Sequence, residues 1–307
     1  MYISPITQYN YNKNNNYNYV PTFCARTRPN FSELVRCINQ TFEKKVERIQ
    51  GNIFNINKSE FQGYTFEMLE NKINSIKNNL KKIKNRQFVT AFKEIELNGR
   101  NIELADKILR NDSLYLNKNM ILQFKSILKV TKTPDEAEAK FIIIKKVLNS
   151  KLLKNNDKIQ SNIGDILYFT NNTEQARARV KVMDCYEQIL KSGKDNALAG
   201  DIITYTHSLP ASDVANSILQ SKWLERNPYI NDCVGDILDT AENPKSAKIL
   251  KVFFANPKFY RNITLLKNCE KIASQEINLF DGNVLESSDE VIKKSIINHL
   301  KNREYKF

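Results

Sequence analysis

The sequence predicts an all-α protein, an α-solenoid of two-helix repeats preceded by a helical hairpin. One observation is a phrase, Gly-Asp-Ile followed by Leu or Ile, that begins at Gly164, Gly200 and Gly235, so that the glycines are 36 and then 35 residues apart. A second observation is that only 8 glycines and 8 prolines occur in 307 residues, which favours long helices over short strands joined by frequent turns. A repeat of about 35 residues with two apolar stretches in each unit indicates two-helix units that stack on their neighbours.

After each phrase, a polar turn precedes a second helix whose first residues include an alanine. The alanines, expected where neighbouring helices approach closely, are Ala176, Ala215 and Ala247 after the three phrases, and Ala137 and Ala105 in two earlier copies that lack the glycine. Polar residues before these stretches can accept hydrogen bonds from the first-turn backbone N–H groups. The expected caps are Thr133 (in a capping box with Glu136, around Pro134), Asn172 or Thr173, Ser212, and Asn243 before Pro244.

Over residues 87–275 the period and the two helices per unit resemble α-solenoids of the HEAT/armadillo type. The units lack the signature phrases of tetratricopeptide and ankyrin repeats, so the resemblance is one of architecture. It implies that each unit buries an apolar face on the next unit. Because glycine costs about 1 kcal/mol relative to alanine inside a helix, three glycines in register predict tight helix packing at Gly164, Gly200 and Gly235.

The N-terminal part of the chain divides into two regions. Residues 1–30 are rich in Asn and Tyr and are expected to form a disordered tail, because this composition cannot bury a core. Residues 31–86 are expected to form the helical hairpin, with one apolar stripe over 31–49 and a second over 66–83. The second stripe has heptad spacing, so a dimerising coiled coil is the alternative.

The repeat array is expected over 87–278 and a C-terminal capping helix within 279–307. Three Asn-rich turns are expected as corners between units: Asn111–Asn117, Asn227–Asn231 and Asn256–Asn262. In these corners Asn-Pro begins a turn, an aromatic or leucine side chain enters the core, and the last Asn caps the next helix. The last helix is expected to begin with a capping box from Ser287 to Glu290 and to bury Val291, Ile292, Ile296, Ile297 and Leu300.

The formal net charge is +13 and the pI is about 9.3. Such a charge is typical of proteins that bind nucleic acids or acidic membranes, but a composition rich in Lys, Asn and Ile, with lysines on solvent-facing helix surfaces, is the favoured explanation. The second hairpin helix is basic and carries the best candidates for phosphate contact. The candidate nucleic-acid contacts are Lys72, Lys77, Lys81, Lys82, Lys84 and Arg86, with Arg177, Arg179 and Lys181 in the array.

Carboxylates form a second candidate surface, an acidic row. Stacking of the units aligns the aspartates of the three glycine phrases, and two more lie on the same helix as the third. The row is Asp165, Asp201, Asp232, Asp236 and Asp239. It can bind a basic partner or a cation, or it can be a solvated edge whose aspartates pair with Lys or Arg of the next unit.

No sequence motif indicates catalysis, a metal or a cofactor. The five cysteines are widely spread without C-x-x-C, which predicts free thiols in a reducing compartment, the cytoplasm. The two histidines, His207 and His299, lack metal-ligand spacing, although a Ser-His-Asp or Cys-His arrangement through His207 stays open. The longest apolar run, Phe141–Ile144, is followed by two lysines, so no membrane span is expected.

These features together predict a non-enzymatic helical-repeat scaffold that binds a protein or peptide partner. The alternative is a nucleic-acid-binding repeat protein that uses the basic hairpin.

Overall fold

The computed structural model describes residues 55–56, 66–84, 86–93, 95–279 and 284–302, and in this part the chain is all-α apart from one two-residue strand pairing. Strands β1 (Asn55–Ile56) and β2 (Glu96–Leu97) pair in parallel, which the sequence did not predict. The expected tail and the expected helix over 31–49 lie outside the described residues.

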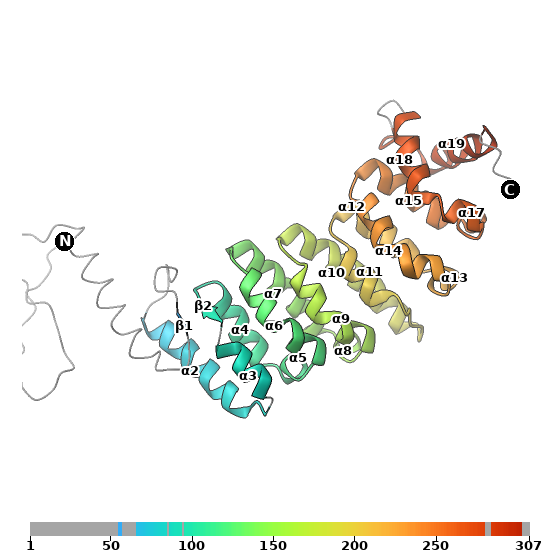
Figure 1. Cartoon of the computed structure of the whole chain (residues 1–307). Helices are drawn as coiled ribbons and strands as arrows, with labels where there is room; N and C mark the ends of the chain where they lie inside the picture. The colour runs from blue at the N-terminus through green and yellow to red at the C-terminus, as the bar shows by residue number, and fades with distance from the viewer. Residues whose placement is uncertain (1–54, 57–65, 85, 94, 280–283, 303–307) are drawn as a thin grey trace, which may run out of the picture.

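Most helices form two rows that run along the array (Figure 1). Within each row, every helix packs on the next one. The first row is α4 (Asn101–Leu109), α7 (Pro134–Asn149), α10 (Thr173–Lys191), α12 (Leu209–Leu219) and α15 (Pro244–Ala255). The second row is α6 (Lys118–Val130), α9 (Asp157–Tyr168), α11 (Ala199–Tyr205), α14 (Pro228–Thr240) and α18 (Cys269–Leu279). This arrangement is compatible with a helical-repeat architecture.

One-turn helices lie at the corners where the chain passes from the first row to the second. They are α5 (Asp112–Tyr115), α8 (Lys151–Lys154), α13 (Lys222–Glu225), α16 (Pro257–Tyr260) and α17 (Ile263–Leu266). The ends of the described array are formed by α2 (Phe66–Lys82), α3 (Arg86–Lys93) and α19 (Asp289–Asn302). Helix α2 packs on α4, and α19 packs on α15 and α18. The heptad stripe of α2 is buried within the chain at Leu69, Ile73, Ile76, Leu80 and Ile83.

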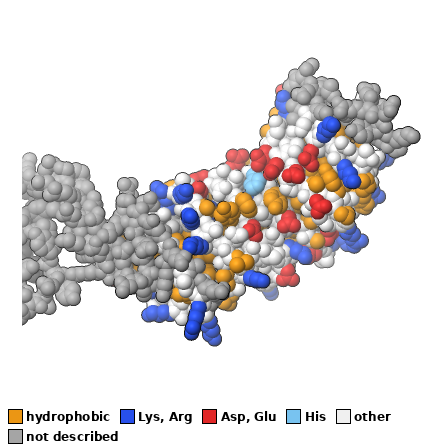
Figure 2. Space-filling model, in the orientation of Figure 1, with side chains coloured by type: hydrophobic (Ala, Val, Ile, Leu, Met, Phe, Trp, Pro, Cys, Tyr) orange, Lys and Arg blue, Asp and Glu red, His pale blue; other side chains and the backbone are white. Residues whose placement is uncertain are grey.

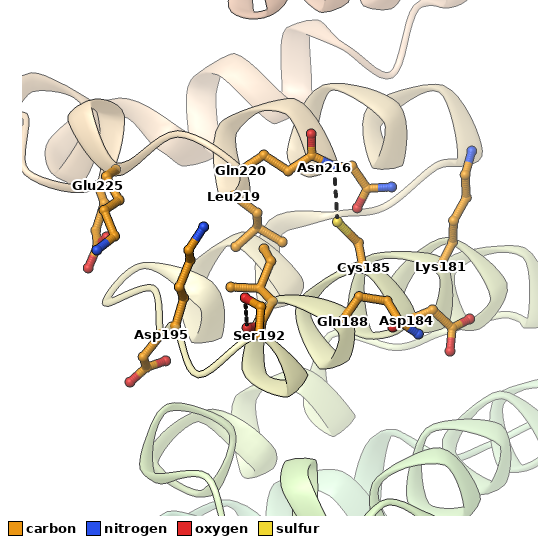
Figure 3. A pocket seen from close by; sticks show the side chains of 13 residues that line it. Lys181, Asp184, Cys185, Gln188, Ser192, Asp195, Asn216, Leu219, Gln220 and Glu225 are labelled. Carbon is orange, nitrogen blue, oxygen red and sulfur yellow. Dashed lines mark hydrogen bonds between the residues drawn. The ribbon is translucent and has the colours of Figure 1, made fainter.

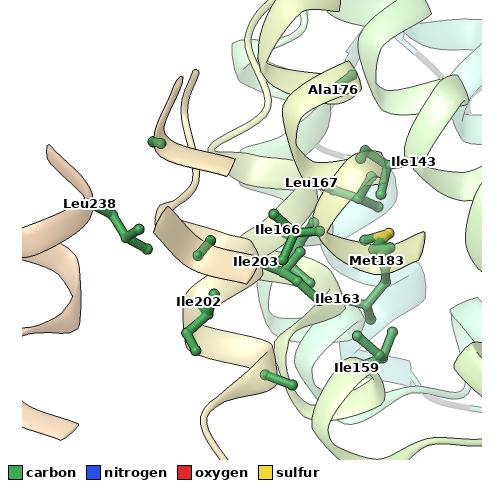
Figure 4. Close-up of a cluster of buried hydrophobic side chains, with 14 of the residues drawn as sticks. Ile143, Ile159, Ile163, Ile166, Leu167, Ala176, Met183, Ile202, Ile203 and Leu238 are labelled. Atoms are coloured by element: carbon green, nitrogen blue, oxygen red, sulfur yellow. The ribbon is translucent and has the colours of Figure 1, made fainter. Parts of the chain in front are cut away.

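The core is continuous between the rows. Ile143 of α7, Ile163 of α9, Met183 of α10 and Ile203 of α11 converge there (Figure 4), and each side chain is fully buried. The repeat alanines are buried as expected, at Ala105, Ala137, Ala176, Ala215 and Ala247. Small residues at these positions let the first-row helices approach one another.

A seven-residue corner motif explains how each unit turns. It reads Ser or Asn, two residues, Leu or Phe, two residues, then Asn, and it occurs at 111–117, 150–156, 221–227 and 256–262. The fourth residue enters the core in every copy, as Leu114, Leu153, Leu224 and Phe259. The last residue accepts hydrogen bonds from first-turn N–H groups of the following helix, as Asn117, Asn156, Asn227 and Asn262. The expected corners at Asn111–Asn117 and Asn256–Asn262 are confirmed. The corner expected at Asn227–Asn231 is wrong, because residues 228–231 already belong to α14 and Asn227 is its cap; the corner lies at 221–227, and a further copy lies at 150–156.

Several helix starts also agree with the sequence. Thr133 and Glu136 form the capping box, Asn243 caps α15, and Asn172 rather than Thr173 caps α10. Two expected caps are wrong. Ser208, not Ser212, caps α12, because Pro210 already lies in the first turn.

The second error is at the last helix. Ser288 Oγ, one residue later than expected, accepts the bond from the Val291 N–H, and this register leaves Val291 exposed while Ile292 and Ile296 are buried.

Candidate functional site

The glycine phrases bring second-row helices into close contact at two of three positions. A Cβ atom added at Gly200 would lie 2.7 Å from the Lys158 carbonyl oxygen of α9. One added at Gly164 would lie 2.8 Å from the Asn119 carbonyl oxygen of α6. Backbone atoms cannot move aside for such contacts, so only glycine fits at either position without a shift of the helices.

The third glycine, Gly235, has more space around it. A Cβ atom at Gly235 would lie 3.6 Å from the Tyr205 ring, which is an ordinary van der Waals distance. The expectation of tight packing is therefore wrong for Gly235. At Gly235, α14 instead faces the Tyr205 ring of α11.

The aspartates that follow the glycines lie along the second row. Asp165 accepts hydrogen bonds of 2.8 Å from the amides of Asn119 and Gln123, both on α6. Partial desolvation and the charge of Asp165 raise the pKa of Asp201. The structure thus brings the first two aspartates of the acidic row into electrostatic contact across neighbouring helices.

The acidic row continues on α14 and α18. Asp232, Asp236 and Asp239 are all exposed. Partial desolvation and the charge of Asp236 raise the pKa of Asp239, and the same two causes raise the pKa of Glu270. Glu270 belongs to this surface, but no glycine phrase precedes it, so no pattern in the sequence pointed to it.

Neighbouring cations do not neutralise these carboxylates. Among the described residues, no Lys or Arg forms an ion pair with the acidic row or with Glu270. The described residues also contain no group of His, Cys, Asp and Glu side chains that could hold a metal ion. The carboxylates therefore repel one another without an internal counterion.

Aromatic rings accompany the first two aspartates. Phe169 and Tyr205 follow Asp165 and Asp201 by four residues, which places each ring on the same helix face as its carboxylate. The two side chains are 41% and 42% exposed. Acidic and hydrophobic side chains accordingly lie together on the face shown in Figure 2. We call this surface the ladder face: Asp165, Phe169, Asp201, Tyr205, Asp232, Asp236, Asp239 and Glu270.

The basic candidates of α2 divide into two groups. Lys72 is engaged internally, since its Nζ lies 2.7 Å from a Glu103 carboxylate oxygen and 3.0 Å from one of Asp106. Burial lowers the pKa of Lys72, but the hydrogen bonds to both carboxylates outweigh it and raise the value. The side chains that remain exposed are Lys81, Lys82, Lys84 and Arg86, and Lys77 is half-buried.

The three basic candidates of α10 do not form one surface. Arg177 is exposed, and Lys181 forms an ion pair of 2.7 Å with Asp213 of α12. Arg179 is fully buried, so its assignment as a nucleic-acid contact is wrong.

Arg179 instead joins the ends of two second-row helices. Its Nε and Nη2 donate to the carbonyl oxygens of Ile203 and Thr204 at the end of α11, over 3.1 and 2.7 Å. Its Nη1 donates to Thr170 Oγ1 beyond α9, over 2.5 Å. The C-terminal carbonyls carry partial negative charge, which favours a cation at this point. Burial lowers the pKa of Arg179 to about 9.

Lys140 occupies the equivalent place in the preceding unit, three residues after the repeat alanine. Its buried Nζ donates to the Thr170 carbonyl oxygen over 2.8 Å. Burial lowers the pKa of Lys140 to about 8, while Glu136 raises it and Arg179 lowers it further. Sequence reasoning missed both roles, because the main-chain acceptors lie 24 to 30 residues away.

A cleft of about 640 Å³ lies between α10, α12 and the following corner (Figure 3). Cys185 lines it and accepts a long hydrogen bond of 3.7 Å from Gln220. Burial raises the pKa of the Cys185 thiol, so at neutral pH it is protonated and not a nucleophile. His207 does not line this cleft; its Nδ1 lies 3.0 Å from Arg179 Nη2. The Cys-His arrangement is therefore not formed between Cys185 and His207.

Comparison with known proteins adds no relative: no family model, no curated protein and no solved structure matches this chain. Within the described residues, no helix combines the length and the apolar character needed to cross a membrane.

Proposed function

We propose that this chain is a non-enzymatic helical-repeat scaffold, a solenoid of the HEAT/armadillo type, that binds a protein or peptide partner on its ladder face. The supporting observation is the pairing of exposed aromatic rings with carboxylates that lack a described counterion. Exposed aromatic side chains are frequent anchors in protein interfaces, because they supply large contact areas. The free thiols of Cys185, Cys233 and Cys269 support placement in a reducing compartment such as the cytoplasm.

The test begins with a displayed library of random peptides selected on the full chain. Peptides that bind are then titrated against the parent and against Phe169→Ser/Tyr205→Ser. We expect affinity at least about tenfold lower in the double variant, because each ring is an anchor. Val291→Ser, which removes a comparably exposed apolar side chain on α19, is the control and should bind as the parent does. Equal binding by the double variant, or a selection that yields no binder, would contradict the proposal.

Nucleic-acid binding is the second candidate function, favoured by four exposed cations, Lys81, Lys82, Lys84 and Arg86, where α2 meets α3. A salt titration with RNA and duplex DNA tests it. If these cations and the half-buried Lys77 bind phosphates, Lys77→Gln/Lys81→Gln/Lys84→Gln should reduce the slope of log K against log salt by about one for each phosphate that is no longer bound. A parent that does not bind at physiological salt would remove this candidate.

A further inference from the structure

Basic side chains are concentrated on one long edge of the array. Figure 1 shows the one-turn helices α5, α8, α13 and α17 along this edge, where the first row passes to the second. Figure 2 shows Lys and Arg side chains along it. The corner segments from α8 onward contribute Lys151, Lys154, Lys158, Lys194, Lys222, Arg226, Lys258, Arg261 and Lys267. We call this surface the basic edge.

Little on the basic edge neutralises these charges. Among the described residues none of the nine cations forms an ion pair. The same segments contain three carboxylates, Asp157, Asp195 and Glu225, and none of them forms an ion pair among the described residues, so nine cations face three anions. The edge therefore carries a net positive charge, and seven of its nine cations are exposed, while Lys154 and Lys158 are half-buried.

The opposite edge provides an internal comparison. The turns from the second row back to the first are 131–133, 169–172, 206–208 and 241–243. Lys132 is their only Lys or Arg, and Glu242 is their only carboxylate. A composition biased towards Lys would load both edges alike. The four turns comprise only 13 residues, with one cation and one carboxylate, whereas the corner segments carry nine cations and three carboxylates; this excess favours a surface with a binding role.

Exposed aliphatic side chains lie at two of these corners and at the α5 corner, which the exposed Lys118 follows. Leu116, just after α5, is 66% exposed, Leu152 of α8 is 39% exposed and Ile263 of α17 is 47% exposed. Surfaces that bind nucleic acid single strands use aromatic rings for stacking. Aliphatic side chains flanked by Lys and Arg instead match the boundary between lipid head groups and acyl chains.

We propose that the basic edge is a docking surface for an anionic lipid bilayer. The lysines and arginines contact the head groups, and Leu116, Leu152 and Ile263 insert between them. Phe169 and Tyr205, the aromatic residues of the ladder face, lie at the C-terminal ends of α9 and α11, away from these corners, so a scaffold held at a membrane keeps both rings accessible.

Vesicle flotation with the full chain tests the proposal. We expect binding to phosphatidylcholine vesicles that contain about a third phosphatidylserine, none to phosphatidylcholine alone, and weakening as salt is added. Each Lys or Arg near an anionic surface contributes roughly a factor of five. Lys154→Gln/Arg226→Gln/Arg261→Gln should therefore bind on the order of a hundredfold more weakly, and Leu152→Ser/Ile263→Ser several-fold more weakly.

Two control variants make the same kinds of change outside the basic edge: one removes three cations and the other removes an exposed leucine. Lys129→Gln/Lys132→Gln/Arg177→Gln removes three exposed cations at or near the turns of the opposite edge, and Leu122→Ser removes an exposed leucine of α6; both should bind vesicles as the parent does. Circular dichroism melting confirms that each variant is folded. Absence of binding to anionic vesicles, or equal weakening in edge and control variants, overturns the proposal. So does RNA binding that depends on the same three edge cations while vesicles are not bound, which would assign the edge to nucleic acid.

Discussion

His207 accepts a hydrogen bond from Arg179. The Nδ1 of His207 lies 3.0 Å from the Nη2 of Arg179, and a guanidinium has no acceptor, so the Nδ1 atom must be unprotonated. The imidazole is consequently neutral, with its proton on Nε2. Because the same guanidinium holds the C-terminal carbonyls of α11, the turn after α11 is tied to the core of the array.

Replacement of Arg179 should destabilise the fold strongly. Arg179→Ala removes four hydrogen bonds and leaves buried carbonyl oxygens and a cavity, for which we expect a decrease of about 3–5 kcal/mol in the free energy of unfolding. Arg177→Ala, an exposed site on the same helix, should change it by less than about 0.5 kcal/mol. Urea denaturation of both variants measures the difference. Similar midpoints would show that the buried network contributes little.

Stability should depend on pH through His207. Burial, with a smaller effect from Arg179, lowers the pKa of His207 to about 4 from 6.5. Between these values the unfolded chain binds more protons than the folded chain, so this contribution is complete above pH 6.5 and is lost as pH falls to 4. His207→Asn keeps an acceptor near the Nδ1 position without titrating there. We expect this variant to lose less stability than the parent between pH 6.5 and 4, measured by urea denaturation; parallel curves would contradict the assignment.

The glycines should respond differently to the same substitution. Gly200→Ala forces a side chain against the Lys158 carbonyl, and we expect overpacking to cost about 1–3 kcal/mol. Gly235→Ala has room beside the Tyr205 ring, and the higher helix propensity of alanine should make it neutral or stabilising by up to about 1 kcal/mol. Melting temperatures of both variants, compared with that of the parent, test this difference. A stable Gly200→Ala would remove the packing explanation.

Removal of one ladder-face carboxylate should stabilise the protein. A raised pKa means that ionised Asp239 is disfavoured in the folded state, and its place near the end of α14 also opposes the helix dipole. Asp239→Asn should therefore raise the melting temperature at neutral pH. Asp232→Asn, earlier on the same helix, should not. A rise in both variants would indicate a general effect of net charge instead of the local one.

Local sequence predicted several helix starts and two of the three expected corners, because their hydrogen bonds join residues only a few positions apart. Thr133 with Glu136 and Asn243 before Pro244 begin helices in the way that their side chains dictate. The Asn residues that end the corner motifs behave likewise. Where two polar residues competed, as with Ser208 and Ser212, the deciding signal was Pro210 in the first turn, which was also local.

Repetition in the sequence also indicated which helices stack, since the period fixes the order of the units. The repeat could not show which glycine is tightly packed, because that depends on which atoms of the neighbouring helix face the glycine. A backbone carbonyl faces Gly200, whereas a ring at ordinary distance faces Gly235. Three aspartates of the ladder face were visible in the glycine phrases, and the repulsion between Asp236 and Asp239 is local to α14. The repulsion of Asp201 by Asp165 and of Glu270 by Asp236 arises only once α9 packs on α11 and α14 on α18.

The tertiary structure alone decided the place of Arg179. Because Arg179 is a basic residue, the sequence placed it on a nucleic-acid-binding surface, and no residue in its own turn of α10 accepts its hydrogen bonds. Only when α11 ends beside α10 do the carbonyl oxygens of Ile203 and Thr204 meet the guanidinium and compensate for its burial. The basic edge arises in the same way, because lysines and arginines separated by whole repeats become neighbours when the corners align.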